Sequence, residues 1–129
     1  MELTLKTTSF AGDDQSWLGS EHGTQATETV VLDTSLFTAN THYPDGFFKS
    51  GIPLGMVTTG GKYGPYDNAA SDGRQTLVGF LFAAVPAPSV NTLDPAAAML
   101  THGKVRESRL PVAVDSAGKV DVAGTIRFV

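Results

Sequence analysis

The sequence contains no cysteine, so disulfide bonds and thiolate chemistry are excluded. No apolar run approaches the roughly 18 residues that a membrane-spanning helix needs, and we expect no contact with a membrane. The beginning of the chain has no basic region followed by an apolar stretch, so we expect no secretion signal. These absences fit a protein made in a reducing cytoplasm. The 129 residues, 41% of them hydrophobic, suffice for one domain with its own core.

Sequence motifs of enzymes are also missing. The Gly-Lys pair at 61–62 is not a phosphate-binding loop, because Met56 occupies the position of the first glycine and Tyr63 follows the lysine. The chain has no Gly-x-Ser-x-Gly and no His-Glu-x-x-His motif. None of the histidines has another ligand type at metal-binding spacing: His22, His42 and His102. We expect no enzymatic activity, no metal and no cofactor; a small hydrolase would need Asp and His side chains converging in a pocket.

The acidic excess of the chain is confined to its first part. Residues 1–29 hold five acidic side chains and one lysine, whereas residues 30–129 hold eight acidic and eight basic side chains. The net charge of −4 therefore belongs to the first segment. Without clustered Lys and Arg, we expect no nucleic-acid binding. An acidic segment suits a partner with positive surface, or is simply a solvated tail.

The same first segment has no helical or strand periodicity beyond a short alternation at its start. Such a segment is not expected to build a core alone. Yet it carries large apolar side chains, including the only tryptophan of the protein: Leu3, Leu5, Phe10, Trp17 and Leu18. Either the segment becomes ordered on an external partner, which we prefer, or it packs on its own domain or on a sister subunit.

The rest of the chain predicts short strands separated by turns. Residues 29–33 begin with three β-branched side chains and predict a short strand. Residues 52–56 alternate apolar side chains with Gly and Pro, and Pro53 indicates an edge strand. Residues 60–66 predict a turn and a short strand. Residues 77–85 are continuously apolar, which favours a central strand buried on both faces over a buried helix, since the stretch is short and Pro86 follows.

One short helix is predicted near residues 92–100, where Thr92 or Asp94 could cap it and Pro95 suits its first turn. Residues 102–109 are a further candidate strand. Three period-2 pairs follow, with a turn at 115–118: Val112/Val114, Val120/Val122 and Ile126/Phe128. The predicted fold class is mainly β: a compact small β-barrel or β-clip-like body with one short helix and an extended N-terminal arm.

Several short motifs occur in an order that covers nearly the whole chain. They are the Ser-Trp-Leu-Gly-Ser-Glu-His-Gly stretch at 16–23, Val-Leu-Asp-Thr-Ser at 31–35, Gly-Ile-Pro-Leu-Gly at 51–55, Leu-Val-Gly-Phe-Leu at 77–81 and Ala-Gly-Thr-Ile-Arg-Phe-Val at 123–129. In this order they resemble the head decoration (capsid cement) proteins of tailed bacteriophages, the family of the phage lambda decoration protein. The first segment is longer than in the lambda protein, and residues 86–102 differ from it.

The resemblance implies a non-enzymatic protein on the outer surface of the virion. It implies homotrimers at threefold and quasi-threefold sites of the expanded head, bound to the major capsid protein and reinforcing the shell against DNA pressure. It also implies that residues 1–29 form an extended capsid-binding arm and residues 30–129 a β-rich body that makes the trimer. The arm residues expected to contact the capsid are Leu3, Leu5, Phe10, Trp17 and Leu18.

An alternative function is a carbohydrate-binding β module on a virion or cell surface. Such a module needs exposed aromatic side chains, and Tyr63 and Tyr66 beside the glycine-rich turn are candidates.

Overall fold

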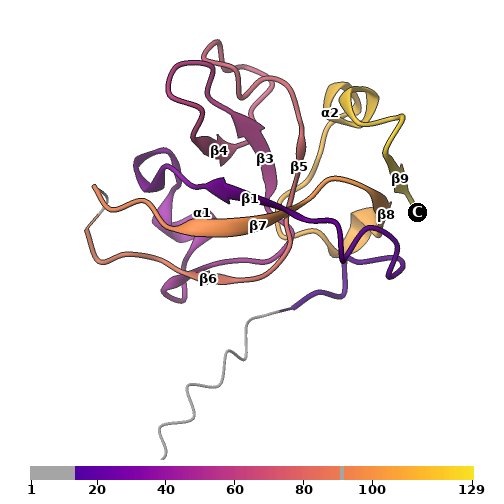
Figure 1. The fold of residues 1–129 in the computed structure, drawn as a ribbon, viewed down its shortest axis with the longest axis horizontal. Helices are drawn as coiled ribbons and strands as arrows, with labels where there is room; N and C mark the ends of the chain where they lie inside the picture. Colours follow the sequence, from indigo (N-terminus) through magenta and orange to yellow (C-terminus); the bar gives the residue numbers. More distant parts are fainter. Residues whose placement is uncertain (1–13, 91) are drawn as a thin grey trace, which may run out of the picture.

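The computed structural model describes residues 14–90 and 92–129 and shows a mainly β fold (Figure 1). A five-stranded antiparallel sheet has the order β1-β7-β5-β3-β4. Its strands are β1 (Glu28–Val31), β7 (Ala96–Leu100), β5 (Gly79–Leu81), β3 (Pro53–Met56) and β4 (Tyr63–Pro65). Just after β1, Leu32 forms a parallel bridge to Tyr63 of β4, and the Asp33 amide donates to the Tyr63 carbonyl at 2.8 Å. The two outer strands thus meet, and the predicted mainly β class is confirmed.

The remaining elements are short. β2 (Phe47–Phe48) pairs with β6 (Val85–Pro86), and β8 (Gly103–Val105) pairs in parallel with β9 (Ile126–Phe128). The helical elements are the 3-10 turns η1 (Thr34–Leu36) and η2 (Glu107–Arg109) and the helices α1 (Ala39–His42) and α2 (Ser116–Asp121). Figure 1 shows α2, β8 and β9 together at one end of the molecule. Within the described chain, no helix has the length and apolarity required to cross a bilayer.

Two hydrophobic cores share the central strands β5 and β7. The first core is built around Phe37, Phe48 and Leu54, and the second around Trp17 and Phe80. Because successive side chains of a strand point to opposite faces, adjacent residues enter different cores: Leu81 and Met99 enter the first, Phe80 and Leu100 the second. The prediction of a central strand buried on both faces is confirmed for β5, although the strand spans three residues of the predicted 77–85.

The predicted helix near residues 92–100 is wrong, because Ala96–Leu100 forms strand β7. This strand has neighbours on both sides, β1 and β5. The backbone of an alanine-rich segment prefers a helix, but hydrogen bonding to two strands and burial of Met99 and Leu100 outweigh that preference.

The segment predicted as paired valines contains a helix instead. In α2, the Asp115 carboxylate accepts a hydrogen bond from the Gly118 amide at 2.9 Å and so caps the N-terminus. Val122 is buried in the second core, while Val120 on the helix is 73% exposed. The sequence signal for this helix is Asp115, because the same residue type suits both a turn and a helix N-cap.

The predicted edge position of Pro53 is also wrong, since β3 lies between β5 and β4. Pro53 is the first residue of the strand, and its carbonyl accepts from the Tyr66 amide just beyond β4. A proline is tolerated at this position because its missing N–H lies at the end of the ladder.

Trp17 ties the first described residues to the rest of the fold. Its side chain has no exposed surface and lies 5.9 Å from the Phe80 ring, centroid to centroid. The indole Nε1 donates to Ser50 Oγ at 2.9 Å, and Ser50 Oγ donates to the Phe82 carbonyl at 2.7 Å. One buried chain of hydrogen bonds therefore joins three distant parts of the sequence.

We predict that Trp17→Ala lowers the free energy of unfolding by about 3–5 kcal/mol, because it leaves a large cavity in the second core. Trp17→Phe should cost less, since it mainly removes the hydrogen bond to Ser50, worth about 1 kcal/mol. Denaturant unfolding followed by circular dichroism measures both. Val90→Ala, at a half-exposed position, is the control, with an expected change within about 0.5 kcal/mol. A Trp17→Ala variant as stable as this control would contradict the assignment.

A second prediction concerns His42, which is 8% exposed at the end of α1. Its Nδ1 accepts from the Thr38 amide at 2.8 Å, so the ring is neutral with its proton on Nε2. Burial, aided by the nearby Lys49 charge, lowers the pKa of His42 below 6.5. The unfolded chain then binds the proton more readily, so stability should fall as the pH drops below about 6.5.

Thermal unfolding between pH 7 and pH 5 measures this effect. His42→Asn keeps an acceptor for Thr38 without a titrating ring, and it should flatten the pH dependence in this range. An unchanged slope in the variant would rule out His42 as its source.

Candidate functional site

Residues 17–19 run antiparallel along β8. Leu18 forms a bridge to Val105, and the Gly19 amide donates to the Lys104 carbonyl at 2.8 Å. The Arg106 amide in turn donates to the Trp17 carbonyl at 2.6 Å. With β9 on its other side, β8 is therefore the middle of a three-stranded ribbon, defined here as residues 17–19, β8 and β9.

Two glycines allow the following turn to lie directly on β8. A Cβ on Gly23, whose φ is +81°, would stand 2.4 Å from the His102 carbonyl oxygen. A Cβ on Gly103, whose φ is +133°, would stand 2.6 Å from the His22 carbonyl oxygen. A side chain at either position would clash with backbone, so this close contact requires glycine both in the turn and on β8.

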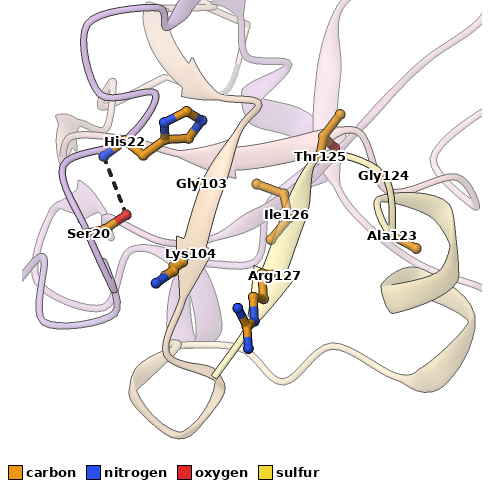
Figure 2. Close-up of a pocket in the computed structure, with 9 residues that line it drawn as sticks. All are labelled: Ser20, His22, Gly103, Lys104, Ala123, Gly124, Thr125, Ile126 and Arg127. Atoms are coloured by element: carbon orange, nitrogen blue, oxygen red, sulfur yellow. Dashed lines mark hydrogen bonds between the residues drawn. The ribbon is translucent and has the colours of Figure 1, made fainter.

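A cavity of about 280 Å³ opens on the exposed face of the ribbon (Figure 2). Lys104 and Arg127 are directly paired in the β8–β9 register, and both are exposed. The lining residues come from the N-terminal turn, β8, the α2–β9 connection and β9: Ser20, His22, Gly103, Lys104, Ala123, Gly124, Thr125, Ile126 and Arg127. We call this the ribbon cavity.

A second cavity, of about 330 Å³, lies where the described chain begins. It is lined by residues of both charges: Asp14, Asp45, Phe47, Lys49, Ser50, Arg109 and Pro111. Hydrogen bonds from Ser16, with a smaller contribution from the Arg109 charge, lower the pKa of Asp14. The first described residue, Asp14, therefore lines this cavity.

The apolar residues expected to contact a partner have different positions. Leu3, Leu5 and Phe10 lie outside the described residues. Trp17 is fully buried in the chain's own second core, and Leu18 is half-buried beside β8 and packs against the same core. For this part of the first segment the structure shows the alternative arrangement, packing on its own domain.

The expected boundary after residue 29 also falls inside an element, since β1 spans Glu28–Val31. Residues 14–29 are therefore integral to the folded body. No sequence periodicity could reveal this, because the segment is held by one tryptophan and by backbone hydrogen bonds.

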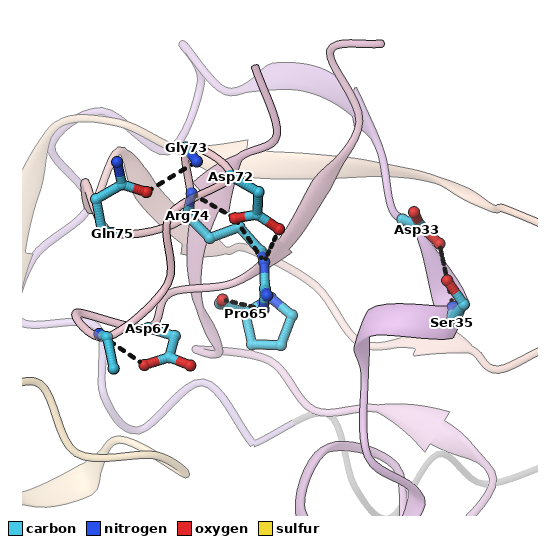
Figure 3. A network of polar contacts seen from close by, with 9 residues as sticks. Asp33, Ser35, Pro65, Asp67, Asp72, Gly73, Arg74 and Gln75 are labelled. Carbon is cyan, nitrogen blue, oxygen red and sulfur yellow. Dashed lines mark hydrogen bonds and ion pairs between the residues drawn. The ribbon is translucent and has the colours of Figure 1, made fainter. Parts of the chain in front are cut away.

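The polar clusters of the described chain serve local structure. In Figure 3, Asp72 accepts from the backbone amide and Nε of Arg74, which lower the pKa of the Asp72 carboxyl. Gln75 accepts from the Gly73 amide in the same loop. Within residues 14–90 and 92–129, no three His, Asp or Glu side chains converge as a metal site would require.

The two tyrosines considered for glycan binding are only partly exposed. Tyr63 packs against the first core. The Tyr66 hydroxyl donates to Asp115 at 2.6 Å, and burial with this carboxylate raises the pKa of Tyr66. They do not form an open aromatic platform, so the geometry does not favour a carbohydrate site.

Comparison with protein families matches residues 11–123 to the family described as bacteriophage lambda head decoration protein D. No curated protein matches the chain. The matched stretch includes Trp17, both central strands and β8, so it covers both cores except Ile126 and two of the three strands of the ribbon. Since the match extends over far more than half of the sequence, the chain belongs to the family of bacteriophage lambda head decoration protein D.

Proposed function

We propose that this protein binds the major capsid protein as a homotrimer, at threefold and quasi-threefold sites of the expanded head, and reinforces the shell against DNA pressure. The observation that carries this proposal is the family match over residues 11–123, which assigns the chain a role in decorating phage capsids. That role is structural, and it locates the protein on the virion capsid. Assembly takes place in the host cytoplasm, where a chain without cysteine needs no oxidising compartment.

Linkage explains how binding would strengthen the shell. A protein that binds only the expanded shell stabilises it by about 2.7 kcal/mol per site at a hundredfold excess over Kd. Three linked subunits around one symmetry axis add avidity, because the second and third contacts form at high effective concentration. Summed over many sites, this free energy opposes rupture.

Within the acidic segment 1–29, we assign capsid binding to residues 1–13, with Leu3, Leu5 and Phe10 as anchors. Residues 14–129 carry the trimer contacts, because residues 14–29 are built into the body through Trp17 and β1. An extended chain of 13 residues spans roughly 45 Å, enough to reach across a neighbouring subunit. Addition as a strand suits such a segment, since main-chain hydrogen bonds supply affinity without a special sequence.

Imaging of the protein mixed with expanded and unexpanded capsids tests the function as a whole. We predict trimer-shaped density at the threefold and quasi-threefold positions of expanded shells and none on unexpanded shells. Equal decoration of both shells would contradict the proposal that binding stabilises the expanded shell selectively. Decoration of neither shell would refute capsid binding altogether.

We further predict that deleting residues 1–13 leaves a protein with nearly unchanged thermal stability that no longer decorates expanded shells. Deleting residues 1–29 should instead prevent stable folding, because it removes Trp17 and part of β1. Circular dichroism and sedimentation with shells measure the two properties. Normal decoration by the shorter deletion would exclude the proposed arm.

A further inference from the structure

The ribbon cavity contains a pair of like charges held side by side. Lys104 on β8 and Arg127 on β9 are partners in a parallel register, so their side chains leave the same face. Both are exposed at the cavity (Figure 2). Like charges at directly paired positions of a sheet are destabilising. The repulsion between Lys104 and Arg127 therefore slightly destabilises the fold, and an anion bound between them would remove that repulsion.

Neither cation has a carboxylate within salt-bridge distance among the described residues. Three of the eight Lys and Arg residues in 30–129 do form ion pairs: Lys62 with Asp94, Arg74 with Asp72 and Lys119 with Glu107. The carboxylates of Asp115 and Asp121, at the two ends of α2, accept hydrogen bonds from other groups. Asp115 accepts from Tyr66 and the α2 N-terminus, and Asp121 accepts from the Leu77 amide.

The position of the cavity relates it to the proposed capsid contact. Ser20 lines the ribbon cavity, and Asp14, at the start of the described chain, lines the other cavity. These two positions are six steps apart along the chain, so their Cα atoms lie no more than roughly 20 Å apart. If residues 1–13 bind the shell, the Lys104–Arg127 pair is close enough to contact the same capsid subunits.

We propose that the ribbon cavity is a second shell-binding site, in which Lys104 and Arg127 hold a carboxylate of an acidic segment of the capsid subunit. This inference rests on the proposed function and names the chemistry of its partner. Lys104 supplies an ammonium and Arg127 a planar guanidinium, which together match the two oxygens of one carboxylate. Two cations on a chain of net charge −4 do not make a nucleic-acid surface.

The test uses the full chain and expanded shells. The double variant Lys104→Gln/Arg127→Gln should bind shells roughly tenfold more weakly at low ionic strength, with a shallower salt dependence than the wild type. Arg106→Gln is the matched control, since Arg106 follows β8 and is exposed but does not line the cavity. Its affinity should stay within about twofold of wild type. Thermal stability of the double variant should be unchanged or higher, because the like-charge pair is gone.

Carbodiimide cross-linking tests the contact directly, because it joins a lysine amine to a carboxylate in contact with it. We expect Lys104 of shell-bound protein to be linked to an Asp or Glu of the capsid protein. Lys104→Arg should keep the affinity and lose the link.

Wild-type affinity and salt dependence in the double variant would overturn the inference while leaving the proposed function intact. A Lys104 link to another copy of this chain, or loss of self-association in the double variant, would overturn it in favour of a contact between subunits. Failure of the wild type to bind shells at all would refute both proposals.

Discussion

Burial of the Trp17 side chain is the constraint on which the other features depend. The indole fills the second core, and its Nε1 begins the hydrogen-bond chain through Ser50 to the Phe82 carbonyl. With the indole in place, the Trp17 carbonyl and the Gly19 amide pair with the backbone around Lys104 and Arg106. The first described residues thereby become one edge of the ribbon, and the turn that follows forms one wall of its cavity.

The interior strands and the outer segments have different roles in this fold. Central strands β5 and β7 hold the two cores together, since adjacent residues on each strand enter opposite cores. Loops and charged turns lie on the outside of these cores, where binding surfaces are commonly placed on a rigid scaffold. The acidic excess belongs to residues 1–29, so these charges can contact a partner without disturbing the two cores.

Much of the fold was predictable, and the errors have physical causes. The apolar stretch around Phe80 indicated a central strand because only a position between two other strands buries both faces. The alanine-rich strand β7 was mistaken for a helix, since local propensity contains no information about the strands on either side. Helix α2 was missed because its cap, Asp115, also suits a turn.

The site was less predictable than the fold. Apolar residues in the first segment indicated a need for burial, but whether the protein's own core or a partner supplies it depends on tertiary contacts. Trp17 found its place in the core, and Leu3, Leu5 and Phe10 remain the proposed anchors. The Lys104–Arg127 pair gave no sequence signal, because the two residues become neighbours only through the parallel β8–β9 register.

We propose that the first residues of the chain bind the capsid and that Trp17 and Gly19, whose backbones pair with β8, already belong to the folded body. Amide hydrogen exchange, measured residue by residue on free protein and on decorated expanded shells, tests this most directly. The account predicts that the amides of Gly19 and Arg106 are protected in the free protein, and that the amides of residues 1–13 gain protection on the shell. Fast exchange at Gly19 in the free protein, or no gain in residues 1–13 on binding, would contradict it.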